Sequence, residues 1–88
     1  MIPKYLQSIF WDINLNNFNP VAYPNYTISR VLEHGDREAV AWMEQAFSGE
    51  QITAVIRTDR GLSRKSANFW ALVYHVPTEE VAALRGTA

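Results

Sequence analysis

A basic cluster in the second half of the chain is the feature best suited to binding chemistry. Four of the eight Lys and Arg residues lie close together and are followed by one amide side chain: Arg57, Arg60, Arg64, Lys65 and Asn68. Guanidinium and ammonium groups bind phosphate oxygens and carboxylates, and arginine and asparagine side chains also read base edges in the major groove of DNA. We therefore predict that this cluster binds either DNA or an acidic surface of a protein partner.

The surroundings of the cluster agree only in part with a DNA-binding element. The cluster lies around the turn between two predicted helices, where a helix-turn-helix protein places phosphate contacts and the start of its recognition helix. The turn departs from that motif, because Gly61 lies too close to the second helix and Arg57 stands where a small residue is expected. A charged cluster can also do no more than solvate the outer side of an apolar helix. The segment around 50–76 therefore stays open between a helix-turn-helix-like element and a solvated surface.

The sequence contains no arrangement of residues that is typical of a catalytic or metal-binding site. His34 and His75 do not have the spacing of a metal-ligand pair, and the chain has no glycine-rich phosphate loop. Ser48 and Ser63 suit helix caps rather than nucleophiles. We expect no enzymatic activity, no cofactor and no metal.

The composition indicates a soluble globular domain. The net charge of the 88 residues is −1, so any binding of nucleic acid must come from a local patch. The chain has no cysteine, which excludes a disulfide framework and agrees with a reducing cytoplasm. No apolar run approaches the roughly 20 residues of a membrane span. We expect a cytoplasmic protein that folds as a single domain over 1–88 and does not enter the membrane.

The spacing of apolar residues predicts a compact all-α domain of five or six short helices. Each predicted helix begins at a residue that can cap it, and Gly35 ends one of them. The predicted caps are Asn25, Asp36, Ser48, Ser63 and Thr78, and the last helix covers 79–85. An α+β alternative stays open, because 51–57 and 69–76 are rich in β-branched and aromatic residues and could pair as a small sheet.

The segment 63–76 is predicted to be the central helix. Phe69, Leu72, Val73 and Val76 share one helical face, and Trp70 continues the apolar surface beside it. We expect the other segments to pack on this face. A second Phe-Trp pair at 10–11 suggests that the N-terminal segment packs beside the same helix, or that one indole is exposed and anchors a partner.

Three segments resemble a family of small bacterial proteins of unknown function. They are the Phe-Trp-Asp segment at 10–12, the Arg-Val-Leu-x-x-Gly-Asp segment at 30–36 and the Leu-Ser-x-Lys-x-x-x-Phe-Trp segment at 62–70. The resemblance implies an antitoxin-like partner of abortive-infection nucleotidyltransferase toxins. It also implies that certain motif residues serve the fold or an interface: Phe10, Trp11, Asp12, Arg30, Gly35, Asp36, Asn68, Phe69 and Trp70.

Two functions follow as expectations. The first is a non-enzymatic binding protein, an antitoxin-like partner of a nucleotidyltransferase toxin. The alternative is a DNA-binding transcriptional regulator that uses the basic cluster. The motif residues also have a physical explanation within the fold, because Gly35 and Asp36 can end one helix and start the next, and Arg30 can pair with Asp12. The sequence leaves the oligomeric state open.

Overall fold

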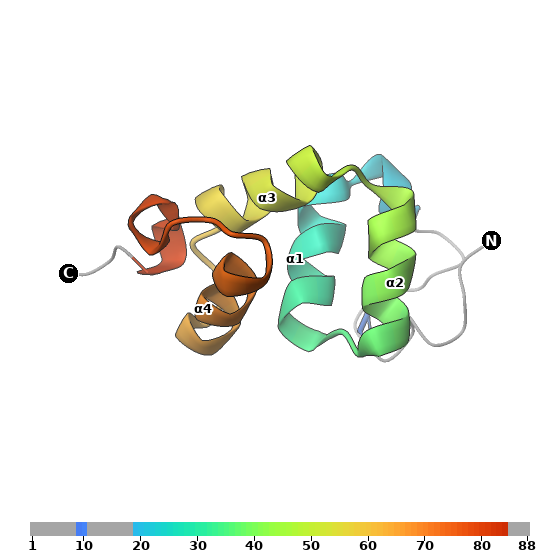
Figure 1. Ribbon diagram of the computed structural model, residues 1–88. Helices are drawn as coiled ribbons and strands as arrows, with labels where there is room; N and C mark the ends of the chain where they lie inside the picture. The colour runs from blue at the N-terminus through green and yellow to red at the C-terminus, as the bar shows by residue number, and fades with distance from the viewer. Residues whose placement is uncertain (1–8, 11–18, 85–88) are drawn as a thin grey trace.

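The described residues form only helices and turns. The computed structural model describes residues 9–10 and 19–84, and no strand occurs among them. The all-α prediction is confirmed, and the α+β alternative is wrong because 51–57 and 69–73 are helical. The α-helices are α1 (Pro24–His34), α2 (Arg37–Ala46), α3 (Gly49–Thr58) and α4 (Arg64–Val73), and the 3-10 turns are η2 (Pro20–Ala22), η3 (Thr78–Glu80) and η4 (Ala82–Leu84) (Figure 1).

Helix α1 is the central helix. It packs against α2, α3 and α4, and Figure 1 shows it between α2 and α4 with α3 crossing above. Ile28, Val31 and Leu32 of α1 are buried, and the buried hydroxyl of Thr27 donates a hydrogen bond to the carbonyl of Pro20 at 2.7 Å. The prediction that 63–76 is the central helix is therefore wrong, since α4 covers one side of α1.

The first turns of α2 and α3 are capped as predicted. Asp36 Oδ1 accepts a hydrogen bond from the amide of Ala39 at 3.0 Å. Ser48 forms a capping box with Gln51, in which each side chain accepts from the backbone amide of the other, at 3.1 and 2.9 Å. These bonds satisfy amides that the start of a helix leaves without an intrahelical partner.

Helix α1 begins two residues before the predicted start at Tyr26 and ends where expected, at His34. Asn25 is not its cap, because the helix starts at Pro24 with Tyr23 as N-cap residue. Proline suits the first helical position, where its missing N–H would have no partner. Gly35 ends the helix at an ordinary φ of −76°, so a left-handed conformation is not the reason for glycine. The reason is close approach: a Cβ at Gly35 would lie 2.6 Å from the carbonyl oxygen of Val31.

The C-terminal segment differs from the predicted helix over 79–85. Two short 3-10 turns, η3 and η4, replace that helix, and Thr78 does not cap it. Between the turns, Val81 has an extended backbone and a fully buried side chain. The burial of Val81 in the core interrupts the helical path, because an extended residue cannot continue a helix.

The N-terminal segment is described only at two residues. Ile9 and Phe10 are buried, and the Phe10 ring packs against Tyr26 of α1 with the ring centroids 6.3 Å apart. The neighbouring motif residues Trp11 and Asp12 lie outside the described residues. None of the described helices is long and apolar enough to cross a membrane.

Candidate partner-binding surface

The start of α4 is attached to the end of α1 by a carboxylate. Ser63 Oγ caps α4 by accepting from the amide of Ser66 at 3.1 Å. Glu33 of α1 then accepts from the amide of Ser63 at 2.8 Å and from the hydroxyl of Ser66 at 3.1 Å. Burial raises the pKa of Glu33, but these hydrogen bonds and the nearby His34 lower it by more, so the net pKa lies below its ordinary value.

The inner face of α4 consists of two alanines and one tryptophan. Ala67 and Ala71 are buried, and their small side chains let the helix sit close to the core. Trp70 is 9% exposed, and its Nε1 donates a hydrogen bond of 2.7 Å to the carbonyl of Leu32. That carbonyl belongs to the last turn of α1, where a helix leaves its acceptors unpaired. Trp70 therefore fills a hydrophobic position and supplies a missing donor.

The end of α4 is also attached to its neighbours. The hydroxyl of Tyr74 donates to Glu44 of α2 at 2.5 Å, and burial together with this carboxylate raises the pKa of Tyr74 well above its ordinary range. His75 adopts a left-handed conformation with φ of 58°. The amide of Val76 reaches back to the carbonyl of Ala71 at 2.8 Å, as in a Schellman motif, so Val76 turns into the core. His75 itself is exposed and does not pack in the core.

The outer face of α4 is apolar and exposed. Phe69, Leu72 and Val73 are 55%, 77% and 44% exposed, so the prediction that they form the buried face is wrong. Successive residues of a helix are about 100° apart, which places these three side chains opposite the buried alanines and Trp70. Of the predicted buried face, only Val76 is in the core, and it lies beyond the end of the helix.

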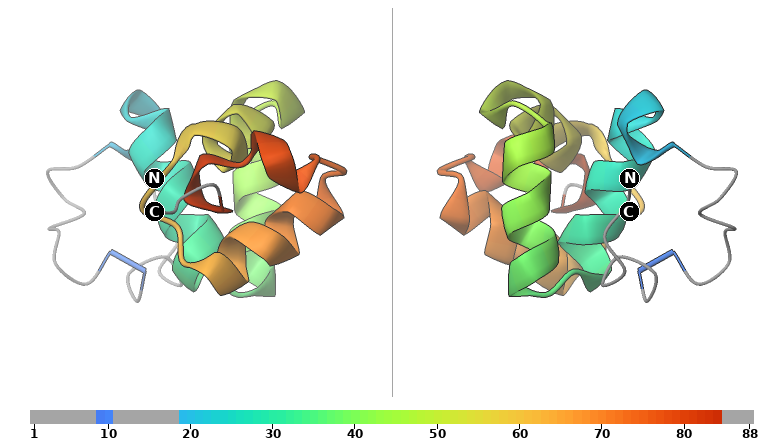
Figure 2. Two further views of the ribbon diagram at one scale, coloured as in Figure 1. Left: turned by 90° about the vertical axis from the view of Figure 1, so that its left-hand side faces the viewer. Right: turned by 90° about the vertical axis from the view of Figure 1, so that its right-hand side faces the viewer.

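Two mostly apolar hollows extend this outer face on both sides. One has a volume of about 420 Å³ and lies between α2 and α4, where Val40 and Ala41 face Phe69 and Trp70. The other has a volume of about 510 Å³ and is lined by α4 and the following segment, including Leu72 and Pro77. The left view of Figure 2 looks onto the side of the molecule that carries α4, η3 and η4. The sequence did not reveal these hollows, because their walls come from segments far apart in the chain.

The structure separates Arg57 from the other members of the basic cluster. Its Nε donates to Glu80 Oε1 at 3.0 Å, so this guanidinium links α3 to η3. Arg60, Arg64 and Lys65 are exposed and form no ion pair within the part of the chain that the structure describes. Arg64 and Lys65 lie in the first turn of α4, and Asn68 is exposed on the next turn.

Lys65 lies on the same exposed face of α4 as Phe69 and Leu72, one turn closer to the start of the helix. Positions i, i+4 and i+7 lie on one helical face, so Lys65, Phe69 and Leu72 form one outward row. We name this row, together with Arg60, Arg64, Asn68 and Val73, the α4 surface. It is cationic at the start of the helix and apolar toward its end.

The geometry around α4 departs further from a helix-turn-helix. The connection from α3 to α4 runs from Asp59 to Ser63, which is longer than the usual three- to four-residue turn. The middle and end of the outer face carry Phe69 and Leu72, where a recognition helix needs polar side chains to contact base edges.

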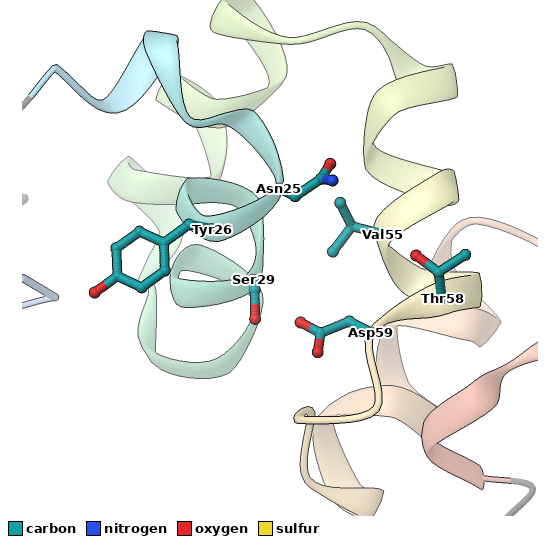
Figure 3. A pocket seen from close by; sticks show the side chains of 6 residues that line it. All are labelled: Asn25, Tyr26, Ser29, Val55, Thr58 and Asp59. Carbon is teal, nitrogen blue, oxygen red and sulfur yellow. The ribbon is translucent and has the colours of Figure 1, made fainter.

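A third hollow, between α1 and α3, is more polar than the two beside α4. It has a volume of about 370 Å³ and is lined by Asn25, Tyr26, Ser29, Val55, Thr58 and Asp59 (Figure 3). Two of its polar groups already make local bonds: the hydroxyl of Thr58 donates to the carbonyl of Ala54, and Asp59 Oδ1 accepts from the amide of Gly61. Ser29 and Asp59 point toward each other across the hollow (Figure 3), but no hydrogen bond joins their side chains, so the geometry supports no specific reaction.

Comparison with known proteins identifies the family. Residues 5–56 match the model of a family of unknown function, DUF6922. The chain belongs to this family. No curated protein and no solved structure matches the chain. The DUF6922 match covers α1, α2 and most of α3, whereas the α4 surface lies beyond the matched residues.

The predicted motif residues within the DUF6922 region have structural roles where they are described. Arg30 donates to the carbonyl of Ile9 at 2.8 Å and to the hydroxyl of Tyr26 at 2.8 and 3.1 Å. Its guanidinium also lies over the ring of Phe10, 5.9 Å from the centroid. Arg30 thus joins the N-terminal segment to α1, while its predicted pairing with Asp12 lies outside the described residues. Gly35 ends α1 and Asp36 caps the start of α2.

Proposed function

We propose that this protein is a non-enzymatic binding protein that docks a protein partner on the α4 surface. The observation that carries the proposal is the exposure of Phe69, Leu72 and Val73 between two apolar hollows. Contiguous exposed apolar surface on a soluble protein is typical of an interaction site. The hydrogen bonds between Glu33 and Ser63 and between Trp70 and Leu32 fix the position of α4. The α4 surface is therefore already formed in the absence of a partner.

The class of partner that we propose is a nucleotidyltransferase toxin of the abortive-infection type, toward which this protein acts as an antitoxin. The support is the resemblance of the segments at 10–12, 30–36 and 62–70 to antitoxin-like proteins. The last of these segments contains the start of α4 and Phe69, and thus overlaps the α4 surface.

The test is co-purification with such a toxin after co-expression. The Phe69→Ala/Leu72→Ala double variant should lose the toxin while remaining folded, because both side chains are more than half exposed. A matched control is Val21→Ala, which removes an apolar side chain that is 55% exposed on η2. Retention of the toxin by the double variant, at the level of the control, would refute docking on α4.

DNA binding is the second candidate, favoured by the exposed Arg60, Arg64 and Lys65, which have no ion-pair partner among the described residues. If this candidate holds, duplex DNA should bind with an affinity that falls with salt. Each lost phosphate contact lowers the slope of log affinity against log salt by about 0.9, so Arg64→Gln/Lys65→Gln should lower it by roughly 2. The protein-partner proposal expects negligible DNA affinity in the parent protein.

A further inference from the structure

We infer that the partner contributes an acidic amphipathic helix, which lies along α4 with its carboxylates at the first turn of α4. This inference rests on the proposed function and specifies the chemistry of the partner at the same surface.

The shape of the α4 surface suits a helix. Phe69 and Leu72 form a ridge, and an apolar hollow follows the ridge on each side. Helices pack by placing the side-chain ridge of one into the groove of the other. A partner helix with apolar side chains at i, i+3, i+4 and i+7 can straddle this ridge and fill both hollows, as amphipathic helices do in hydrophobic grooves.

The charge distribution specifies which end of the partner is acidic. Arg60, Arg64 and Lys65 surround the start of α4, and these three cations outnumber the Glu33 carboxylate that already binds the first turn of the helix. The end of α4 presents Leu72 beside Pro77, together with the exposed Val73, and carries no charged side chain in its last turn. A complementary helix therefore places Asp or Glu side chains against the cations and apolar side chains against Leu72 and Val73.

A second copy of the same chain complements this surface poorly. Packing two α4 helices in parallel would bring Arg64 and Lys65 of both copies together, and like charges repel. Packing them antiparallel would place these cations against the exposed Leu72 and Val73 of the other copy. In the antiparallel arrangement the carboxylate that we find at the end of α4 is that of Glu44, which already accepts from Tyr74, so a different protein with several carboxylates is the better occupant.

The experiment is a selection from a displayed library of helical peptides. Each peptide has leucine at the positions that form one face of its helix, and every other position varies among Glu, Lys and Gln. Binders are selected on the full chain and counter-selected on Phe69→Ala/Leu72→Ala, so that only peptides dependent on the α4 surface remain. We expect these peptides to be enriched in Glu toward one end. Enrichment in Lys, no charge bias, or no dependent binder at all would overturn the inference.

Charge variants then test the position of the carboxylates. Arg64→Gln/Lys65→Gln should weaken a selected peptide about fivefold, as expected for two exposed charge pairs. Gln45→Glu/Ala54→Glu changes the net charge by the same amount at exposed positions of α2 and α3, and should leave the affinity unchanged. Equal weakening by both variants would show a general charge effect and overturn the placement of the carboxylates.

Competing occupants give distinct results. A dimer that dissociates on dilution in the parent and is lost in Phe69→Ala/Leu72→Ala would make a second copy the occupant. Competition between duplex DNA and the selected peptides would make DNA the ligand. The two proposals fail separately: toxin retention by the double variant refutes docking on α4, whereas peptides that depend on α4 but carry no acidic end refute only the partner's chemistry.

Discussion

The indole of Trp70 donates its hydrogen bond to the carbonyl of Leu32, across 38 positions of the chain and from one helix to another. This bond ties the middle of α4 to the last turn of α1 and orients α4 about its own axis. Trp70 faces inward as a result, and its neighbour Phe69 faces outward with its ring edge-on to the indole, 4.9 Å between centroids. The orientation of one side chain thus determines which apolar residues remain available to a partner.

The two neighbouring aromatic residues should differ sharply when truncated. Trp70→Phe removes the donor to a buried carbonyl and leaves a gap, so it should destabilise the fold by about 2 kcal/mol. Phe69→Ala should change the free energy of unfolding by no more than about 0.5 kcal/mol, as is usual for an exposed side chain. Urea denaturation of both variants checks this. A larger loss for Phe69→Ala than for Trp70→Phe would mean that α4 packs with its other face inward.

Gly35→Ala should destabilise the junction of α1 and α2. The added methyl group would lie 2.6 Å from the carbonyl oxygen of Val31 and 2.9 Å from its Cγ1, so the backbone must shift. We expect a loss of about 1–3 kcal/mol, the usual range for overpacking. Gly49→Ala is the matched control, because its Cβ would meet nothing within 4 Å, and it should be neutral or slightly stabilising. Equal thermal stability of both variants would contradict the steric explanation.

His75→Gly should stabilise the protein. His75 has a φ of 58° at the end of α4, where a side chain costs about 1 kcal/mol and glycine does not. The midpoint of thermal unfolding should therefore rise by about 4–8 °C for a domain of this size. His75→Val should lower it, because a β-branched residue tolerates this conformation least. A lower midpoint for His75→Gly would show that the imidazole makes a stabilising contact.

Glu33 should make stability depend on acid pH. Its pKa in the folded protein lies below the ordinary value of 4.5, so the unfolded state binds the proton more readily. The stability that Glu33 contributes is present above the ordinary value and is lost as the pH falls through the folded pKa. Urea unfolding followed from neutral to acid pH should show a steeper loss for the parent than for Glu33→Gln. Identical slopes would mean that Ser63 and Ser66 do not stabilise the charged form.

The helices and most of their ends follow from short-range information. The caps at Asp36, Ser48 and Ser63 join a side chain to an amide three positions later, so the residues that form them lie together in the sequence. The end of α1 at Gly35 is equally local, because the clash that requires glycine is with the preceding turn. These features could be predicted from residue type and spacing, and they were.

The face of α4 that turns inward could not be predicted in this way. Its apolar residues surround most of the helix, and periodicity favoured the face of Phe69, whereas Trp70 is the buried residue. The choice depends on the donor that Trp70 offers to Leu32 and on the bonds from Glu33 to Ser63, which join residues 38 and 30 positions apart. Val81 is a similar case, since its burial breaks a helix that the local sequence favours. Local hydrogen bonds form wherever the residues are adjacent, whereas the orientation of an apolar helix depends on donors, acceptors and space that distant segments supply.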